Sequence, residues 1–411
     1  MNKVTDILSF INKHDVKFIK VSIIDILGCK KSVELPVSSL EDIRKNQVKC
    51  DSSSIVGGRD ANDSDMNIII DESSASLAND CTLEIYGSLG VDNKTMYSLD
   101  SRYVLLKQMK ILMSRGYQLN VGLEPEFYLV DKENLEPIDN LTYFSFEEND
   151  LSALIRRKAA TALLNEGYVI GPYHHEVGPG QCEINFSYAD AMNSADRLYR
   201  YKEIIKSVAR TEGCIATFLP KPFDDLPGSG MHLNCSLSDL NGKNLIIDEQ
   251  TNNLSVIAKR FIDGILFHAK SLCAFSCTIN NSYERLHSNM ESPSKISCLL
   301  NDRTAAIRIP YSSSREKSRF EIRFVDNSAN LYLLLAGIIA AGLDGIDHPG
   351  REYNTNSVEE NLPHSLKEAL YELSNDELMI NALGKDLVNR YTQEKIKEDY
   401  STPLNVLIRK Y

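Results

Sequence analysis

The 411-residue chain combines 43% hydrophobic residues with 57 acidic and 45 basic residues, which gives a formal net charge of −12 at pH 7. This length allows two or three domains with a large core and excludes a disordered or fibrous protein. The acidic balance and the lack of a basic cluster disfavour binding to nucleic acid or to an anionic membrane. No apolar run approaches the roughly 18 residues of a membrane span, and no signal-peptide pattern opens the chain. We therefore expect a soluble cytoplasmic protein that acts on small metabolites.

The nine cysteines are odd in number, widely scattered and without a CxxC pair. This spacing favours neither a disulfide framework nor a thiolate zinc site, so we expect most of them to be small buried residues.

The first hundred residues predict a small unit of helix and sheet. Apolar residues at helical spacing indicate a helix over residues 4–13, and strands are expected over 16–27 and 31–37 on either side of Gly28. Residues 50–80 are rich in Ser, Asp and Gly, which predicts a loop with one short strand at 66–70.

A second domain is expected from residue 101 onward. Asp100 or Ser101 caps a helical pattern that ends at Gly116, so we divide the chain into domains at 1–100 and 101–411. Further helices alternate with strand-like segments, many of which are candidates for antiparallel pairing, and the predicted fold class is therefore α+β. These helices are expected at about 150–165, 189–212, 253–274 and 328–345.

Five strand-like segments alternate apolar residues on one face with acidic, basic or imidazole side chains on the other. In residues 122–130 (GLEPEFYLV), Glu124 and Glu126 lie two positions apart and so project from the same face. The other four segments are residues 174–177, 181–186, 231–237 and 319–324. Their polar faces carry Glu176, Glu183, His232, Asn234, Ser236, Arg319, Glu321 and Arg323.

These polar faces allow two interpretations. Each one, taken singly, is an ordinary solvent-exposed face of a half-buried sheet. Five such faces, rich in Glu, Arg and His and without Lys, instead favour a shared interior that binds ions. Five glutamates and one histidine form an oxygen-rich ligand set that suits Mg²⁺ or Mn²⁺, and six ligands allow two ions.

Glycines and arginines accompany this predicted cation site. Gly228 and Gly230, in KPFDDLPGSGMHLNCS, would let the backbone approach a ligand closely, although a GSG sequence is more often only a turn. Five arginines offer planar donors for carboxylates and phosphates, namely Arg285, Arg303, Arg308, Arg319 and Arg323. Neither a P-loop sequence nor a GxGxxG sequence is present, which argues against those modes of nucleotide binding.

Seven segments, in order and spacing, resemble the bacterial type I glutamine synthetases over essentially the whole chain. They are EPEFYLV (124–130), HHEVGPGQCEI (174–184), KPFDDLPGSGMHLNCS (221–236), NSYERL (281–286), NDRTAAIRIP (301–310), RFEIR (319–323) and AGLDGI (341–346). The resemblance implies an N-terminal β-grasp domain, a C-terminal catalytic domain with a funnel-like antiparallel sheet, and a dodecamer of two stacked hexameric rings.

The resemblance also implies roles for individual residues. The first metal ion would be held by Glu126, Glu176 and Glu183, and the second by Glu124, His232 and Glu321. Substrate glutamate would contact Gly228, Arg285 and Arg323, while the ATP side would include Asn234, Ser236, Arg303, Arg308 and Arg319. Glu291 aligns with the flap glutamate that closes the site, and Asp51 with an aspartate donated by a neighbouring subunit.

The implied reaction is the ATP-dependent ligation of ammonia to the γ-carboxylate of L-glutamate. ATP would convert this carboxylate to γ-glutamyl phosphate, with two cations, Arg303 and Arg308 offsetting the charge of the phosphoryl group. Asp51 would bind and deprotonate ammonium, and Glu291 would complete the ammonium site and shield the acyl phosphate from water. The products would be glutamine, ADP and phosphate.

Four positions depart from the usual pattern of the family. Ser52 replaces a glycine, Pro227 an asparagine, Asp302 another asparagine and Leu331 a proline. Because serine resists backbone geometries that glycine allows, Ser52 predicts a different placement of the loop that presents Asp51. Residues 347–363 are short and show no counterpart of the adenylylated tyrosine loop, so adenylylation is not expected.

Two alternative functions stay open. A γ-glutamyl-amine ligase would use the same acyl phosphate but a polyamine, methylamine or other amine, whereas retention of Asp51 and Glu291 favours ammonia. A catalytically silent relative would have no physical reason to keep mutually repelling carboxylates. His174 and His175 are each open to a structural or a site role, and His268 is expected to pack rather than bind a ligand.

Overall fold

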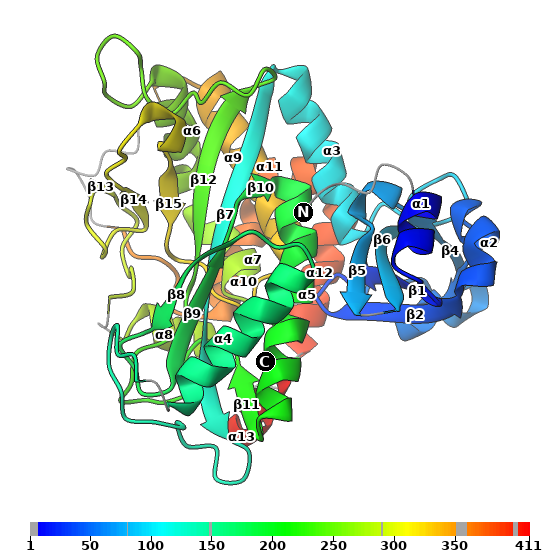
Figure 1. The fold of residues 1–411 in the computed structure, drawn as a ribbon. Coiled ribbons are helices and arrows are strands. Elements are labelled where there is room, and N and C mark those ends of the chain that lie inside the picture. The colour runs from blue at the N-terminus through cyan, green and yellow to red at the C-terminus, as the bar shows by residue number, and fades with distance from the viewer. Residues whose placement is uncertain (1–6, 80, 148–149, 289–290, 351–359, 398–401) are drawn as a thin grey trace.

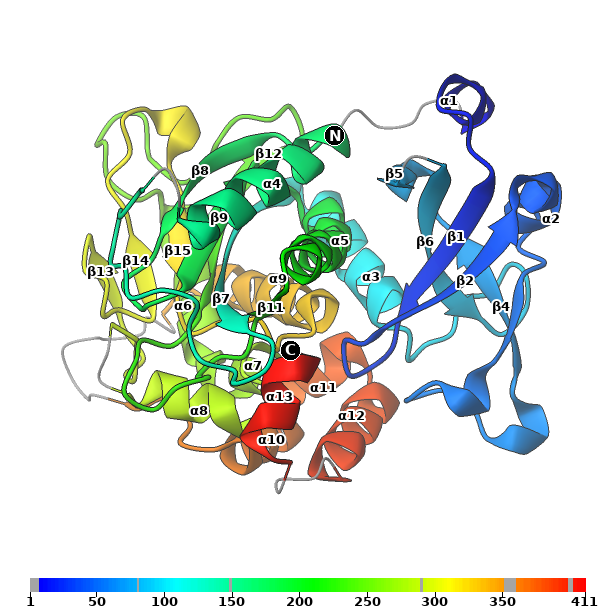
Figure 2. The same ribbon diagram turned by 60° about the horizontal axis from the view of Figure 1, so that its bottom comes forward.

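The chain folds into a small and a large β-sheet with helices between and around them. A computed structural model describes residues 7–79, 81–147, 150–288, 291–350, 360–397 and 402–411. Helices α3 (Ser101–Ser114) and α5 (Ala191–Thr211) lie between the two sheets (Figure 1 and Figure 2). None of the helices in the described ranges is long and apolar enough to cross a membrane.

The small sheet has six strands in the order β2-β1-β6-β4-β3, with β5 also paired to β6. Strand β1 runs parallel to β6, and the other pairs are antiparallel. The strands are β1 (Phe18–Ile24), β2 (Lys30–Pro36), β3 (Lys49–Asp51), β4 (Asp65–Ile70), β5 (Ser76–Asn79) and β6 (Thr82–Gly90). Together with α1 (Ile7–Lys13) and α2 (Leu40–Arg44), the sheet encloses its own hydrophobic core.

The predictions for this region are confirmed in part. The two expected strands are β1 and β2, and Gly28 between them has a φ of +85°, which favours glycine. The expected helix is present as α1, while residues 4–6 lie outside the described residues. The prediction of a single strand within 50–80 is wrong, because β5 and the end of β3 accompany β4. These short strands lack a clear apolar alternation and are defined by backbone pairing to their neighbours.

The large sheet has nine strands in the order β13-β14-β15-β12-β7-β9-β8, with β10 and β11 also paired to β7. They are β7 (Tyr117–Asp131), β8 (Ile170–His175), β9 (Gln181–Phe186), β10 (Ala189–Asp190), β11 (Cys214–Thr217), β12 (Met231–Asp239), β13 (Cys298–Leu300), β14 (Ile307–Ile309) and β15 (Phe320–Ile322). Along β7, Leu119, Val121, Leu123 and Phe127 are buried in strict alternation with polar residues, as expected.

Helices supply the other wall of the main core. Helix α9 (Leu331–Asp347) is the most buried, with every residue from 331 to 345 in the interior, and it packs against α3 and α6. A helix that is apolar all round is typical of a central, fully buried position. The remaining helices are α4 (Leu151–Asn165), α6 (Val256–Phe267), α7 (Ala269–Ser276), α8 (Asn280–Leu286), α10 (Leu366–Asn375), α11 (Glu377–Leu383), α12 (Lys385–Lys397) and α13 (Leu404–Lys410).

Three boundaries in the second half differ from the prediction. The single helix expected over 253–274 is two helices, α6 and α7, which meet at His268. The strand expected over 174–177 ends at His175, so Glu176 lies in the following turn. Strand β15 covers only 320–322, where it pairs with β12 and β14. Tertiary hydrogen bonds set these ends, and periodicity alone does not locate them.

Buried polar contacts join the small sheet to the helices beside it. Nζ of Lys30 lies 2.7 Å from Glu84 on β6 and 2.9 Å from Glu203 on α5. Asn330, which caps α9, donates a hydrogen bond of 2.9 Å to the carbonyl of Ile26. Because removal of one partner would leave a buried charge or donor unpaired, these contacts fix how the small sheet sits on α5 and α9.

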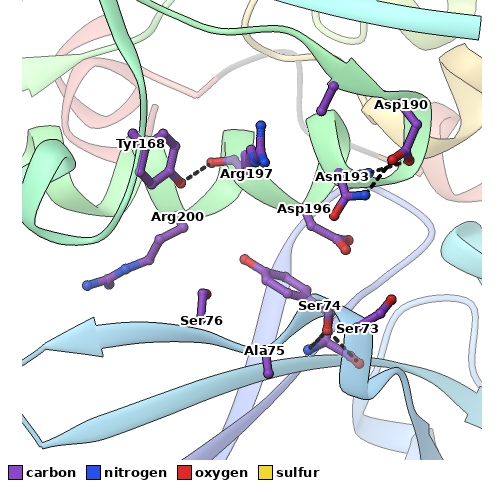
Figure 3. Close-up of a pocket in the computed structure, with 12 residues that line it drawn as sticks. Ser73, Ser74, Ala75, Ser76, Tyr168, Asp190, Asn193, Asp196, Arg197 and Arg200 are labelled. Carbon is purple, nitrogen blue, oxygen red and sulfur yellow. Dashed lines mark hydrogen bonds between the residues drawn. The ribbon is translucent and has the colours of Figure 1, made fainter. Parts of the chain in front are cut away.

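A small cavity of about 190 Å³ lies at the same interface (Figure 3). Residues 73–76 line it from the small-sheet side. The other side is lined by β10 and the first half of α5, namely by Ala189, Asp190, Asn193, Asp196, Arg197 and Arg200. Tyr168 closes one end, where its hydroxyl donates to the carbonyl of Arg197 at 2.9 Å. The lining combines hydroxyl and charged groups with the rings of Tyr86 and Tyr168.

His268 joins three helical segments where α6 ends. Its buried ring places Nδ1 2.7 Å from the carboxylate of Asp376 and Nε2 3.3 Å from that of Asp344 on α9. Burial lowers the pKa of His268, but hydrogen bonds and charges from the two aspartates outweigh it and raise the pKa above its ordinary value. The imidazolium form donates to both carboxylates and therefore stabilises this junction.

Replacement of His268 by Gln should lower the thermal stability more at pH 6 than at pH 9. Since the folded-state pKa is raised, the stabilising contribution is complete below the unfolded pKa and is lost as the pH rises through the folded one. We expect the Tm difference between wild type and H268Q, measured by calorimetry at fixed protein concentration, to be larger at pH 6 by about 2 °C or more. The variant H14Q, which removes a ring in contact with Phe10, serves as control. Equal Tm differences for H268Q at both pH values would contradict the assignment.

Candidate active site

A cavity of about 680 Å³ opens over the polar faces of the large sheet. Most of the predicted site residues line it, although they come from segments almost 200 positions apart. Those that line it are Glu124, Glu126, Glu176, Glu183, Gly228, His232, Asn234, Arg285, Glu291, Arg303, Arg308, Arg319, Glu321 and Arg323. The predicted residues that do not line it are Asp51 and Ser236.

One group of potential metal ligands comes from three adjacent strands. Ligand atoms of Glu124, His232 and Glu321 all lie within 4.8 Å of one another. The pairing of β12 with β7 sets His232 opposite Glu124, and Nδ1 of His232 lies 3.5 Å from Glu321 on β15. Burial and the charge of Arg323 lower the pKa of His232 to about 4. The ring is therefore neutral at pH 7, which is the form that binds a metal ion.

A second group is formed by His174, Glu176 and Glu183. The imidazole lies between the two carboxylates, with Nδ1 3.3 Å from Glu176 and Nε2 3.4 Å from Glu183. Burial, followed by the charges of Glu126 and Glu183, raises the pKa of Glu176 to about 8. Burial lowers the pKa of His174, but the hydrogen bond and charge of Glu183 and the charge of Glu176 outweigh it and raise the pKa.

Glu126, which the resemblance assigns to the same ion as Glu176 and Glu183, lies directly opposite Glu183 in the pairing of β7 with β9. Its Oε2 accepts hydrogen bonds from the backbone N–H of Gly230 at 2.8 Å and from the amide of Gln181 at 3.2 Å. Burial raises its pKa, and the charge of neighbouring Glu183 adds to the increase. Glu126 and Glu183 are directly opposed in the pairing of β7 with β9, so their carboxylates face the same cavity.

Both groups fit a hard divalent cation. Their donors are carboxylate oxygens with one imidazole each, which is the chemistry that Mg²⁺ and Mn²⁺ accept. Burial, and then repulsion between neighbouring carboxylates, raises the pKa values of Glu124, Glu126 and Glu176, and a bound cation would relieve both costs. The donor set and the electrostatics of the cavity therefore agree.

The arginines of the cavity carry hydrogen-bond donors without partners. Nη1 of Arg308 and Nη1 of Arg323 contact the two oxygens of Glu321 at 2.7 and 2.5 Å. Nη2 of Arg285 donates to the carbonyl of Arg323 at 3.2 Å. Buried nitrogens remain on all three arginines, Nη1 of Arg285, Nε of Arg308 and Nε of Arg323, without a hydrogen-bond partner among the described residues. Such orphaned donors fit an anionic ligand that carries carboxylate or phosphate oxygens.

The glycine loop before β12 needs its glycines in order to pack against Arg285. A Cβ at Gly228 would lie 2.7 Å from Cγ of Arg285, and one at Gly230 would lie 2.6 Å from its Nη2. The loop is held from below by Tyr128, whose hydroxyl donates to the carbonyl of Pro227 at 2.7 Å. Proline at position 227, where the family usually has asparagine, therefore still accepts this hydrogen bond through its backbone carbonyl.

The other end of the cavity continues along β13 and β14. There Nε of Arg319 donates to the side-chain oxygen of Asn234 at 2.6 Å, and Arg303 is exposed at the rim. A second cavity of about 480 Å³ shares Arg319 and Tyr311 with the first. Ser236 lies two residues beyond Asn234 on the same face of β12, outside the first cavity.

Asp51 and Glu291 occupy different places in the single chain. Glu291 lines the cavity and has a φ of +55°, an uncommon conformation for a residue other than glycine. Asp51 is exposed on β3 of the small sheet, where its carboxylate accepts from the backbone N–H and hydroxyl of Ser53. One chain therefore does not bring Asp51 to the cavity.

The remaining departures are explained locally. Ser52 does not have a positive φ, and its hydroxyl donates to the carbonyl of Ser64 at 2.8 Å, so this position does not require glycine. Asp302 accepts from the backbone N–H of Thr304 at 2.8 Å and thus stabilises its own turn. Leu331 is the first residue of α9 and is fully buried. Residues 351–359, within the segment considered for adenylylation, lie outside the described residues.

Sequence reasoning left several cavity residues unassigned. His174 precedes Glu176 by two positions and Gln181 precedes Glu183 by two, so the same alternation could have included both. Tyr143 and Phe144 come from an irregular loop without periodic signal. Their rings stack at 4.1 Å, and Phe144 meets the ring of His174 edge-on at 5.0 Å.

Two family models match the chain. Residues 15–81 match the glutamine synthetase β-grasp domain, and residues 98–406 match the glutamine synthetase catalytic domain. Members of this family normally use ATP and divalent metal ions and assemble from several subunits.

Known proteins and solved structures agree with these matches. A glutamine synthetase of Pyrococcus woesei is 38% identical over 94% of this chain and 91% of its own length. A glutamine synthetase of Thermus thermophilus is 35% identical over 96% of this chain and 94% of its own length. An ADP complex of a protein named GmaS has a TM-score of 0.84 at 28% identity, covering 96% of this chain and 95% of its own. A Plasmodium falciparum glutamine synthetase has a TM-score of 0.85 at 25% identity, covering 96% and 94%. These relatives come from archaea, bacteria and a eukaryote. Because both family models and these relatives match nearly the whole chain, the chain is a ligase of the glutamine synthetase family, with an N-terminal β-grasp domain and a C-terminal catalytic domain.

Proposed function

We propose that this chain joins ammonia to the γ-carboxylate of L-glutamate at the expense of ATP, and forms glutamine, ADP and phosphate. The observation that carries the proposal is the cavity in which two groups of hard metal ligands adjoin buried arginine nitrogens without partners. Cation ligands beside donors for carboxylate and phosphate oxygens are what transfer of a phosphoryl group to a carboxylate requires.

The residues divide between the two halves of the reaction. Arg285, Arg323 and the backbone at Gly228 would bind glutamate and orient its γ-carboxylate, which attacks the terminal phosphorus of ATP to give γ-glutamyl phosphate. Arg303 and Arg308 would contact the phosphate oxygens, with Arg319, Asn234 and Ser236 on the nucleotide side. Two Mg²⁺ or Mn²⁺ ions, when held by Glu126, Glu176 and Glu183 and by Glu124, His232 and Glu321, would offset the charge of the phosphoryl group.

The acceptor half requires a neutral amine next to the acyl phosphate. Asp51 of a neighbouring subunit would bind ammonium and take its proton, after which ammonia attacks the acyl carbon and phosphate leaves. Glu291 would close the ammonium site and exclude water. We infer a dodecamer of two hexameric rings from the resemblance to the family. In such a ring, a repeated heterologous contact would bring one subunit's small sheet to the next subunit's cavity.

Three narrower assignments belong to the same proposal. We assign the chain to the bacterial type I subtype from its seven sequence segments. We divide its domains between residues 100 and 101, where Asp100 caps α3. A cytoplasmic location stays a prediction from the sequence.

A second candidate is a γ-glutamyl-amine ligase. It is favoured by the likeness to the structure named GmaS, which has nearly the same TM-score as the structure described as a glutamine synthetase. Both candidates share the acyl phosphate, and they differ only in the amine that attacks it.

An assay of ADP release separates these candidates. With glutamate, ATP and Mg²⁺ present, we expect ammonium to support turnover and equimolar methylamine or putrescine to support much less, because Asp51 and Glu291 suit a small cation. Mass spectrometry of the product verifies the amide formed. Turnover with an amine but not with ammonium would replace the first candidate by the second.

Replacement of Glu124 by Ala should reduce Mg²⁺-dependent ADP release by more than about 100-fold, since even outer-shell partners of a metal ligand typically contribute 10- to 100-fold. The control is E249A, which removes an exposed carboxylate paired with Lys243. A silent relative would show no turnover in the wild type either. Full activity of E124A would overturn the metal assignment.

The variants D51N and E321A should each be inactive alone but complement each other in mixed assemblies. Asparagine keeps an acceptor for the Ser53 N–H while removing the base. When the two tagged chains are co-expressed in equal amounts, about a quarter of the contacts in a ring combine an intact Asp51 with an intact cavity. We expect purified mixed assemblies to recover about that fraction of wild-type activity. No recovery in assemblies shown to contain both chains would contradict a shared site.

A further inference from the structure

A buried histidine–aspartate pair lies behind the second group of metal ligands. His175 is fully buried at the end of β8, with Nδ1 2.6 Å from the carbonyl oxygen of Glu176. Its Nε2 lies 3.1 and 3.3 Å from the two carboxylate oxygens of Asp139, 36 positions earlier in the chain. Both neighbours are acceptors, so the ring makes both hydrogen bonds when each nitrogen carries a proton.

Asp139 gathers further donors on the same carboxylate. Its Oδ1 accepts from the backbone N–H of Gly180 at 2.7 Å and of Leu141 at 3.1 Å. Burial raises the pKa of Asp139, but the hydrogen bonds from His175, Gly180 and Leu141 outweigh it and lower the pKa to about 2. One ionised carboxylate therefore holds the loop after residue 139, the end of β8 and the turn before β9.

The hydrogen bonds around this pair reach two segments of the cavity wall, the turn that carries Glu176 and the loop that carries Tyr143. Glu176 stands at the start of the turn that Asp139 closes at Gly180, and its own N–H donates to the carbonyl of Gln181 at 2.8 Å. The carbonyl of His175 accepts from the N–H of Phe144 at 3.0 Å, which brings the loop of Tyr143 to the same wall. Neither Asp139 nor His175 lines the cavity itself.

The turn that carries Glu176 is closely packed at Gly180. Gly180 has a φ of +67°, and a Cβ there would lie 2.6 Å from the carbonyl of Leu129. At Gly180 the turn thus packs closely against β7 and is bound to Asp139, and at Glu176 it contacts His175. The backbone of Glu176 lies outside any strand, and it is held by its own N–H bond to Gln181 and by the contact of its carbonyl with His175.

We propose that Asp139 and His175 are positioning residues, which fix the backbone of Glu176 so that its carboxylate is preorganised for a divalent cation. The inference rests on the proposed function only in requiring that the cavity binds a metal ion. Residues that orient a metal ligand without binding the ion themselves typically contribute 10- to 100-fold to metal affinity. They need not touch the ion or the substrate.

Binding of Mn²⁺ to the full-length protein, without nucleotide or glutamate, tests this role directly. Free Mn²⁺ is followed by electron paramagnetic resonance. We expect D139N to weaken one Mn²⁺ binding step by about 10-fold, while kcat at saturating Mn²⁺ stays within a few-fold of wild type. The matched control is D376N, which breaks a buried histidine–aspartate pair of similar geometry outside the cavity and should bind Mn²⁺ as wild type does.

Two further variants keep the test valid if D139N does not fold. In H175Q the amide nitrogen takes the place of Nε2 and keeps the contact with Asp139, while in H175N it takes the place of Nδ1 and keeps the contact with Glu176. Because the pair acts as a unit, both should weaken Mn²⁺ binding.

The possible failures are distinct. Folded D139N or H175Q with wild-type Mn²⁺ affinity, or a loss of kcat that saturating Mn²⁺ does not restore, would overturn the positioning role alone. A wild-type protein that binds no Mn²⁺ would overturn the metal site on which the proposed function depends.

Discussion

Mutual repulsion among carboxylates that share one cavity is the constraint around which the catalytic domain is arranged. From β7, the turn after β8, β9 and β15, five glutamates project into the same space, namely Glu124, Glu126, Glu176, Glu183 and Glu321. The protein offsets part of this repulsion, since Arg308 and Arg323 bind Glu321 and the ring of His174 lies between Glu176 and Glu183. Bound metal ions would offset the remaining repulsion between the carboxylates. Such an arrangement costs free energy unless charge is brought to it, and this is the physical argument for cation chemistry.

The large sheet meets this constraint through backbone pairing. The register of β12 against β7 sets His232 opposite Glu124, and the register of β15 against β12 sets Glu321 beside Asn234. The opposite faces of these strands belong to the main core, together with the fully buried helix α9. Slippage by one residue would exchange the two faces, burying the carboxylates in the core and exposing the apolar residues. The hydrophobic core thus stabilises the site by fixing its register.

Periodicity in the sequence predicted the strand-borne part of the site, whereas it misplaced or missed residues held by turns and loops. Alternation with period two identified Glu124, Glu126, Glu183, His232 and Glu321, because side chains on a strand point to alternate faces whatever surrounds them. Glu176 was identified, but as part of a strand, whereas it lies in a turn fixed by His175 and distant Asp139. Tyr143 and Phe144 had no periodic signal at all. Loop conformation depends on tertiary contacts, which periodicity does not contain.

By itself, the sequence determined the local order of this protein: which segments alternate, where α3 is capped by Asp100, and which charged residues share a face. Only the tertiary structure decided how those faces combine. It placed the ring of His174 between Glu176 and Glu183, and among the described residues it left buried nitrogens of Arg285 and Arg323 without hydrogen-bond partners. It also tied Asp139 to His175 across 36 positions. The reason is that side-chain direction follows from backbone geometry within a few residues, whereas distances between distant segments follow from packing of the whole core.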